Sequence, residues 1–200
     1  MMPAMTIAAA LLGYALGSIP FGLLLTRLVG INIREVGSGN IGTTNVLRTG
    51  NKGLAAATLL LDAGKGAVAV ILGRLVGGEL AGIVAGSAAF FGHCFPIWLR
   101  FRGGKGVATI LGITLGAAPL AGGIALGVWL GGALITRRSS VGGMAAGIAC
   151  PLAVLALGGD WAHAWAAHLA VLAALLVWLH RENIARLRAG TEPRIRQKAK

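Results

Sequence analysis

Four long apolar stretches, separated by short basic segments, are the feature of this sequence that most restricts its fold. They cover residues 4–26, 53–99, 106–136 and 141–179. Only 12% of the residues are charged, about half the fraction found in a soluble domain. Because a membrane-spanning helix needs about 20 apolar residues, the sequence predicts an all-α integral membrane protein. The 33 glycines fit this class, since small residues let membrane helices approach closely.

The lysines and arginines indicate how these stretches cross the membrane. The first stretch is long enough for one span, and each of the other three is too long for one and has cations at both ends. Because basic residues stay on the cytoplasmic side, each long stretch should form a hairpin. Glycine, proline and acidic residues place the turns at 76–80, 116–123 and 158–161. We therefore predict seven transmembrane helices in one domain, residues 1–200, with the N-terminus outside and the C-terminus cytoplasmic.

Three segments qualify this topology. The hairpin at 106–136 has only 31 residues for two helices, so its arms should be short, tilted or partly re-entrant. No cation precedes Arg27, so the first stretch should remain as a span instead of being cleaved as a signal peptide. The C-terminal cations should act mainly as topology signals; they are Arg194, Arg196, Lys198 and Lys200.

The first predicted cytoplasmic loop, residues 34–53, reads REVGSGNIGTTNVLRTGNKG. Its glycines can free backbone N–H groups to converge on an anion, and its hydroxyls and amides add neutral hydrogen bonds. Arg48 can bind a phosphate through two parallel hydrogen bonds. The composition favours an anion site over a polar loop that only connects two helices. The polar members are Ser38, Asn40, Thr43, Thr44 and Asn45.

The second loop contains RFRGGKGVAT, residues 100–109. Gly103, Gly104 and Gly106 surround Lys105, and a helix is predicted from Val107. The N-terminus of a helix offers free N–H groups and a positive dipole end to phosphate. The spacing is not that of a Walker A loop, so nucleotide hydrolysis is disfavoured.

The third basic segment follows the last apolar stretch and begins at His180. If the last helix continues, His180 and Asn183 share a face, and Glu182 can pair with Arg186. His180 could serve as base, acid or phosphate donor, or could be a satisfied residue at a helix end. His163 and His168 are interpreted as structural.

The remaining ionisable residues limit other kinds of chemistry. Asp62 and Lys65 lie three apart inside an apolar stretch, which favours a structural pair that anchors the first loop against the helices. Cys94 and Cys150 have no metal-binding spacing and should be buried. The six acids are isolated from one another, so no metal site and no Ser-His-Asp triad is expected. Nucleic-acid binding is excluded, because no soluble fold remains to present a basic face.

Three blocks of sequence resemble the bacterial acyl-phosphate:glycerol-3-phosphate acyltransferases, which are membrane enzymes of phospholipid synthesis. The blocks are GSGNIGTTNVLRTGNKG continuing to DAGKG, then GHCFPIWLRFRGGKGVAT, then HRENIARLRAGTE. The resemblance implies transfer of a fatty acyl group from acyl phosphate to the sn-1 hydroxyl of glycerol 3-phosphate. It implies neither a cofactor nor an acyl-CoA or acyl-carrier-protein donor. The partners would be the two substrates and membrane lipids, without an obligatory protein partner, at the cytoplasmic side of the cell (inner) membrane.

The resemblance also implies roles for individual residues. Lys105 with Gly103 and Gly104 would bind phosphate, His180 and Asn183 would position glycerol 3-phosphate, and Glu182 would be structural. Ser140 is preferred over Ser139 as a further site residue. Phosphate contacts from the first block would come from Ser38, Gly39, Thr43, Asn45 and Arg48.

Two other functions fit parts of the pattern. A transporter for an anionic solute would place polar groups near the membrane midplane, where only Asp62 and Lys65 qualify. A non-catalytic scaffold that binds lipid headgroups would explain the cations but not the loops rich in glycine, hydroxyls and amides. For an acyltransferase, no residue is an evident nucleophile. We therefore expect direct attack by the substrate hydroxyl, with His180 or a substrate phosphate accepting the proton.

Overall fold

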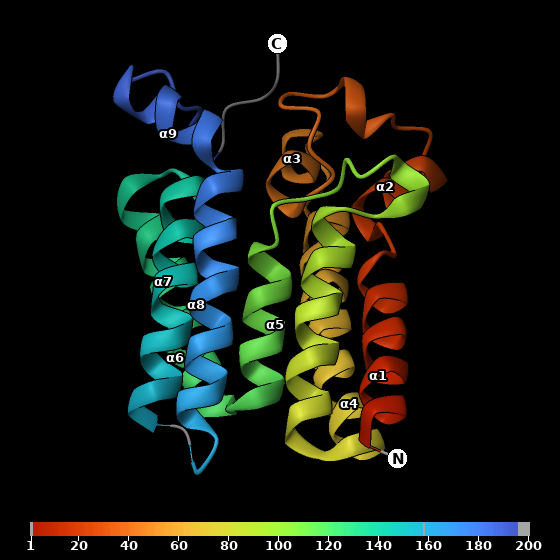
Figure 1. Cartoon of the computed structure of the whole chain (residues 1–200). Helices are drawn as coiled ribbons and strands as arrows, with labels where there is room; N and C mark the ends of the chain where they lie inside the picture. The colour runs from red at the N-terminus through yellow and green to blue at the C-terminus, as the bar shows by residue number, and fades with distance from the viewer. Residues whose placement is uncertain (1, 158, 196–200) are drawn as a thin grey trace.

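The computed structural model describes residues 2–157 and 159–195, and within these ranges all regular structure is helical (Figure 1). Most helices run side by side, and the short helices α2, α3 and α9 gather at one end (Figure 1). The elements in chain order are α1 (Met2–Gly17), α2 (Phe21–Leu28), the 3-10 turn η1 (Ile33–Glu35), α3 (Thr43–Arg48), α4 (Lys52–Cys94), the 3-10 turn η2 (Ile97–Leu99), α5 (Val107–Ala117), α6 (Pro119–Thr136), α7 (Ser139–Leu157), α8 (Ala162–Leu179) and α9 (Arg181–Arg188).

The three predicted hairpins are present. α4 consists of two helices joined across non-helical Gly77 and Gly78, and Gly78 has a φ of 73°, which suits glycine. Only Ala118 separates α5 from α6, and Pro119 opens α6 at the first helical position, where its missing N–H removes no helical bond. α7 and α8 are separated at 159–161; residue 158 of the predicted turn lies outside the described residues.

The first apolar stretch differs from the expected single helix. α1 ends at Gly17 and α2 begins at Phe21, so the chain leaves the helix at Ser18–Pro20. Pro20 explains the break, because it lacks an N–H and disfavours helical geometry in the residue before it. The carbonyl of Ile19 accepts a hydrogen bond from the Lys65 ammonium at 2.8 Å. Lys65 therefore stabilises the break between α1 and α2.

Small residues hold the helices close together. A Cβ added to Gly13 of α1 would lie 2.2 Å from the carbonyl oxygen of Ala85, and one added to Gly112 of α5 would lie 1.8 Å from that of Ala63. These approaches are possible only without side chains, as expected for helices that associate in a membrane by packing.

Helix α5 is short and central, as expected for an arm of the 106–136 hairpin. Its 11 residues extend only ~16 Å, and residues 109–114 are buried. In Figure 1 it begins below the end of α8 that carries α9. At its other end, Arg74 donates to the carbonyls of Gly116 and Ala117, which satisfies acceptors that the helix leaves free. A helix too short to span a membrane is thus held inside the bundle.

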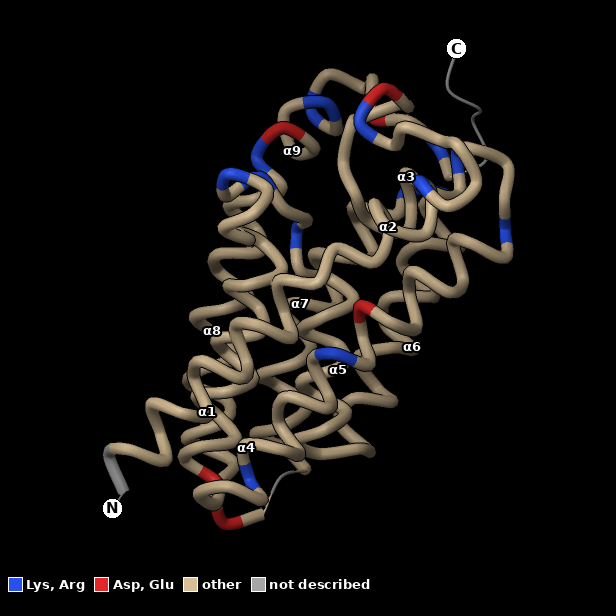
Figure 2. Tube along the Cα trace, turned by 90° about the vertical axis from the view of Figure 1, so that its right-hand side faces the viewer, with Lys and Arg blue, Asp and Glu red and all other residues tan. Residues whose placement is uncertain are grey.

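Five helical segments of the described chain are long and apolar enough to cross a membrane, and one of them, Lys52–Leu99, contains the Gly77–Gly78 break. Lysine and arginine concentrate at the end that carries α2, α3 and α9 (Figure 2). The total of seven spans and their orientation stay predictions. The interpretation of the C-terminal cations as topology signals also stays largely a prediction, because Arg196, Lys198 and Lys200 lie outside the described residues.

Candidate active site

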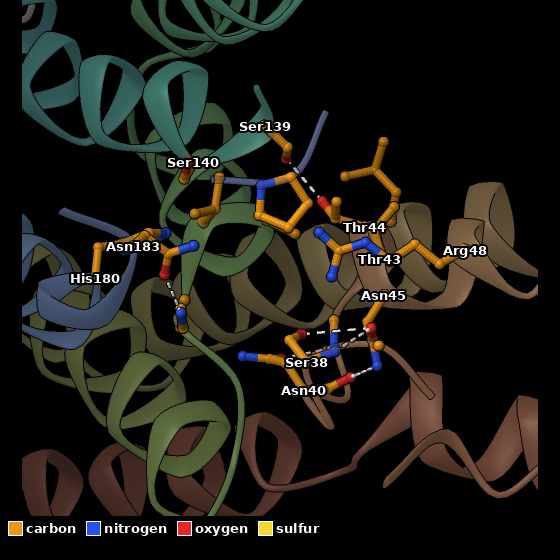
Figure 3. Close-up of a pocket in the computed structure, with 18 of the residues that line it drawn as sticks. Ser38, Asn40, Thr43, Thr44, Asn45, Arg48, Ser139, Ser140, His180 and Asn183 are labelled. Atoms are coloured by element: carbon orange, nitrogen blue, oxygen red, sulfur yellow. Dashed lines mark hydrogen bonds between the residues drawn. The ribbon is translucent and has the colours of Figure 1, made fainter. Parts of the chain in front are cut away.

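A cavity of about 530 Å³ lies at the basic end of the bundle, where three segments distant in sequence meet. Figure 3 shows His180 and Asn183 on one side and Ser38 and Arg48 on the other, with the Arg48 guanidinium pointing toward the middle. Lys105 lines the same cavity. The predicted site residues that line it are Ser38, Asn40, Thr43, Asn45, Arg48, Lys105, Ser140, His180 and Asn183.

Asn45 gives the first loop its shape. Its Nδ2 donates to the carbonyls of Val36 and Asn40, each at 2.8 Å, and its Oδ1 accepts from the Ser38 N–H at 3.1 Å. Since the side chain is buried and its bonds go to the loop itself, Asn45 positions the loop. The predicted phosphate contact of Asn45 stays a prediction, and two neighbouring side chains offer groups without a hydrogen-bond partner in the described residues. Among the described residues no hydrogen bond occupies the Arg48 guanidinium, and the buried Thr43 hydroxyl has no partner.

Gly39, Gly103 and Gly104 do not line the cavity, and their predicted role as phosphate contacts stays a prediction. The N–H groups of Gly103 and Gly104 donate to the carbonyls of Cys94 and His93, each at 3.0 Å, and that of Gly39 donates to Val36 at 2.9 Å. A Cβ on Gly104 would lie 2.1 Å from His93 Nε2. Gly103 and Gly104 therefore allow close packing, which brings the Lys105 loop against the end of α4.

Lys105 projects into the cavity from just before α5. Gly106, with φ 83°, ends the loop and precedes the predicted helix start at Val107, which is confirmed. The Lys105 ammonium donates to Asn183 Oδ1, so it joins the second and third segments. Burial lowers the pKa of Lys105, the Arg186 charge lowers it further, and Glu182 and Glu192 raise it.

His180 lies at a break in the chain between α8 and α9, so the last helix does not continue as assumed from the sequence. Its Nδ1 lies 2.8 Å from the Leu176 carbonyl, which assigns the ring proton to Nδ1 and leaves Nε2 as an acceptor. Burial lowers the pKa of His180 to about 4, although the Leu176 bond opposes this shift; nearby Lys105 contributes to the lowering. At neutral pH the imidazole is therefore uncharged.

Glu192 organises the third segment, and sequence reasoning missed this role. Its Oε1 accepts from the Ser140 hydroxyl and from Asn183 Nδ2, and its Oε2 accepts from Arg186 Nε, all at 2.7 Å. The expected Glu182–Arg186 pair is wrong, because Arg186 pairs with Glu192. Burial alone would raise the pKa of Glu192, but its three hydrogen bonds and the Arg186 charge lower it. The only sequence signal was its place at the end of the third block.

Ser140 and Ser139 both line the cavity at the start of α7. The Ser140 hydroxyl donates to Glu192, whereas the Ser139 hydroxyl lies 2.7 Å from that of Thr44 and so connects α7 with the first loop. The two serines therefore link α7 to the third segment and to the first loop.

Asp62 and His93 reach the cavity from α4. The predicted Asp62–Lys65 pair is confirmed at 2.7 Å, and His93 Nδ1 lies 3.7 Å from Asp62 Oδ1. The pair does not anchor the first loop as expected, because Lys65 bonds to Ile19 at the α1–α2 break. Cys94 and Cys150 are buried and free, as predicted.

The charges of the cavity suit an anionic ligand. Arg48, Lys105 and Arg186 line it, while the nearby Glu192 carboxylate is engaged by hydrogen bonds. Burial lowers the pKa of Arg48, with Glu192 opposing and Arg186 adding to the shift. No group of three or more metal-binding side chains occurs in the described part of the chain.

The fold and cavity define a helical membrane protein with a cavity lined by cationic side chains at one end of the bundle. Comparison with known proteins gives the family. The family model for glycerol-3-phosphate acyltransferase matches residues 7–190, and the chain belongs to this family. A glycerol-3-phosphate acyltransferase of Agrobacterium fabrum is 54% identical over 98% of this chain and 95% of its own length. A glycerol-3-phosphate acyltransferase of Roseobacter denitrificans is 56% identical over 94% of this chain and 92% of its own length.

Solved structures agree with this assignment. The crystal structure of PlsY, an integral membrane glycerol 3-phosphate acyltransferase, in its glycerol 3-phosphate form matches with a TM-score of 0.88 at 34% identity, covering 94% of both chains. The lysophosphatidic acid form of PlsY matches with a TM-score of 0.87 at the same identity and coverage. The present chain is thus an integral membrane acyltransferase of phospholipid synthesis.

Proposed function

We propose that this protein, acting as one domain over residues 1–200, transfers a fatty acyl group from acyl phosphate to the sn-1 hydroxyl of glycerol 3-phosphate. The products are lysophosphatidic acid and inorganic phosphate, and the site faces the cytoplasm at the inner membrane. One observation carries the proposal: Arg48, Lys105 and His180, from three separate segments, line one cavity. A transporter would need polar groups along a path across the membrane, whereas these three side chains lie at one end of the bundle.

The cavity offers separate groups to the two phosphates. Arg48, with the Ser38 and Thr43 hydroxyls, forms one donor set on the first loop, and Asn40 holds the turn that presents them through its bond to Gly42 N–H at 2.9 Å. Lys105 and Asn183 form the other, with His180 beside them. Holding two anions close despite their repulsion is the main task, since proximity and charge stabilisation supply most of the rate.

Apolar residues give the acyl chain a place in the same cavity. Leu59 of α4, Val107 and Ala108 of α5 and Trp129 of α6 complete its wall. The lipid tail can therefore lie among membrane-embedded helices while the acyl phosphate group meets the cations. This arrangement favours a lipid-borne donor over a soluble one.

The chemistry needs no protein nucleophile. The glycerol hydroxyl oxygen attacks the acyl carbon, the bond between that carbon and the bridging phosphate oxygen breaks, and phosphate leaves with the electron pair. The hydroxyl proton passes to a substrate phosphate, because phosphate has a pKa near ~6 and is a stronger base than His180, whose pKa is about 4. His180 Nε2 then serves to accept a hydrogen bond and orient glycerol 3-phosphate. Mass spectrometry that trapped an acyl-enzyme would contradict direct transfer.

Purified protein in nanodiscs, given labelled glycerol 3-phosphate with either acyl phosphate or acyl-CoA, tests the proposal. Labelled lysophosphatidic acid and an equal amount of phosphate should form with acyl phosphate alone. Equal rates with acyl-CoA would overturn the donor assignment. Absence of product with both donors, from protein that keeps its helical content, would overturn the proposed activity.

A further inference from the structure

A second hollow lies outside the acyl-transfer cavity and is unusually rich in arginine. Its volume is about 330 Å³, within the lower range of small-molecule pockets. Two chain segments form it: one from α2 to η1 and one at η2 and the loop that follows. The lining residues are Leu23, Arg27, Arg34, Trp98, Leu99, Arg100 and Arg102.

Within the described residues, the four arginines of this hollow have no acidic counterpart. No carboxylate lines the hollow, and the ion pairs found in the described ranges involve other cations. Arg34 donates to the carbonyls of Gly39 and Arg102, which fixes its guanidinium beside a like charge. Burial and the Arg102 charge both lower the pKa of Arg34. An anion bound here would relieve this repulsion.

The hollow lies where two apolar segments end. The candidate membrane spans Ala4–Leu28 and Lys52–Leu99 both end at residues beside it. Trp98 is 55% exposed and donates its indole N–H to the Ser18 carbonyl at 2.7 Å, and Phe101 is 58% exposed. Exposed aromatic rings with a fixed polar edge are typical of the membrane–water interface. A ligand can therefore place an anionic group among the arginines and an apolar tail along the helices.

The backbone conformation at Arg100 and Phe101 is more closely defined than a topology signal requires. Arg100 and Phe101 have φ values of 51° and 60°, in the left-handed region that costs energy for residues other than glycine. The Phe101 and Arg102 N–H groups, bonded to Pro96 and Leu99 at 3.0 and 3.1 Å, hold this conformation. A topology signal needs only positive charge near a span. A defined concave arrangement of four guanidinium groups needs another explanation.

We propose that this hollow binds the headgroup phosphate of an anionic membrane phospholipid at a site separate from the acyl-transfer cavity. Arginine matches phosphate through parallel hydrogen bonds, and the flanking aromatic residues favour a lipid over free phosphate. Because Arg34 joins the first loop at Gly39 to the second loop at Arg102, a bound lipid also strengthens the connection between the two loops of the active site. The inference does not depend on the proposed reaction.

Lipid binding in nanodiscs tests the proposal directly. Protein in phosphatidylcholine discs receives spin-labelled phosphatidylglycerol or spin-labelled phosphatidylcholine, and the immobilised fraction is measured. In the double variant R27Q/R100Q, the preference for phosphatidylglycerol over phosphatidylcholine should fall about thirtyfold, as expected for the loss of two arginines that attract an anionic lipid. The matched control R137Q/R188Q removes two exposed arginines elsewhere on the chain and should keep the preference.

Two further arms separate the alternatives. The Lys105→Ala variant should keep the immobilised phosphatidylglycerol, because the substituted residue lies in the other cavity. If the double variant fails to fold, the single variant Arg27→Gln is used, and its preference for phosphatidylglycerol should fall about fivefold. Equal losses in R27Q/R100Q and R137Q/R188Q would show only diffuse attraction and overturn the proposal. Displacement of the lipid by millimolar inorganic phosphate, or loss of binding in Lys105→Ala, would overturn it as well.

Discussion

Lys105 combines partial burial, a fixed partner and a place in the cavity wall, which makes it the residue with the strongest expected effect. Its ammonium is held by Asn183, so its position is set before substrate binds. Charge placed in advance stabilises developing negative charge without reorganisation, which is usually the largest single contribution to catalysis.

Lys105→Ala should lower kcat/KM at least ~100-fold, the usual effect of removing one preorganised electrostatic group. Thermal stability should change little, because the side chain is partly exposed in an open cavity. Lys52→Ala is the control, since Lys52 is exposed and lies outside the cavity. Phosphate release and melting temperature are measured for both; full activity in Lys105→Ala would remove the residue from the mechanism.

His180→Ala should slow turnover and raise the KM for glycerol 3-phosphate, while the shape of the pH profile stays the same. The pKa of His180 is lowered from 6.5 to about 4, so the imidazole is neutral throughout pH 5–8 and does not titrate there. An acid limb near pH ~6 should come from substrate phosphate and persist in the variant. Steady-state rates from pH 5 to 8 check this. Loss of the acid limb in the variant would identify His180 as the titrating base.

Individual residues also show what the sequence could predict. The sequence indicated Arg48, Lys105 and His180 as candidate site residues, and the structure places all three on one cavity, while their roles in the reaction stay predictions. Hydrogen-bond partners did not follow from the sequence. Glu192 bonds to Ser140, 52 positions away, and such a contact depends on how the segment after α9 lies against α7. Loop-internal bonds such as those of Asn45 were missed too, because spacing does not reveal which atom a side chain reaches.

At the scale of helices, the breaks build the site. Gly77–Gly78 and Pro119 were readable as turns because glycine and proline impose their own backbone geometry. The break at His180 has neither residue nearby, so the sequence carries no signal for a break there. That break redirects α9 and brings Asn183 to Lys105. A break that tertiary packing causes, without a local signal, is the kind that pattern reasoning misses.

Gly112→Ala should destabilise the protein and reduce activity, because a Cβ there would lie 1.8 Å from the Ala63 carbonyl and push α5 from α4. Overpacking of this kind costs about 1–3 kcal/mol, and α5 begins at Val107, two residues after Lys105. Gly127→Ala in α6 is the matched control, since nothing lies within 4 Å of its Cβ position. Thermal unfolding in detergent should show a lower Tm for Gly112→Ala alone. Equal Tm values would show that α4 and α5 do not depend on this close approach.

At the scale of the whole molecule, charge distribution sets the predicted orientation. Most cations and the cavity share the end that carries α2, α3 and α9 (Figure 2), and the turns inside α4 and between α5 and α6 lie at the other end (Figure 1). The positive-inside rule therefore predicts that the cavity faces the cytoplasm. A soluble phosphorylated substrate would then reach it from the compartment where such metabolites are made.

Cysteine labelling in oriented vesicles tests this orientation together with the number of spans. The native Cys94 and Cys150 are buried and should not react with a membrane-impermeant maleimide. Leu80→Cys and Asp160→Cys, exposed near two hairpin turns, should react only from the outside, and Arg188→Cys on α9 only from the cytoplasmic side. If Leu80→Cys reacted from the same side as Arg188→Cys, α4 would not cross the membrane twice and the seven-span topology would be wrong. If all three patterns were reversed, the hairpins would stand but the cavity would face outward, away from the soluble substrate.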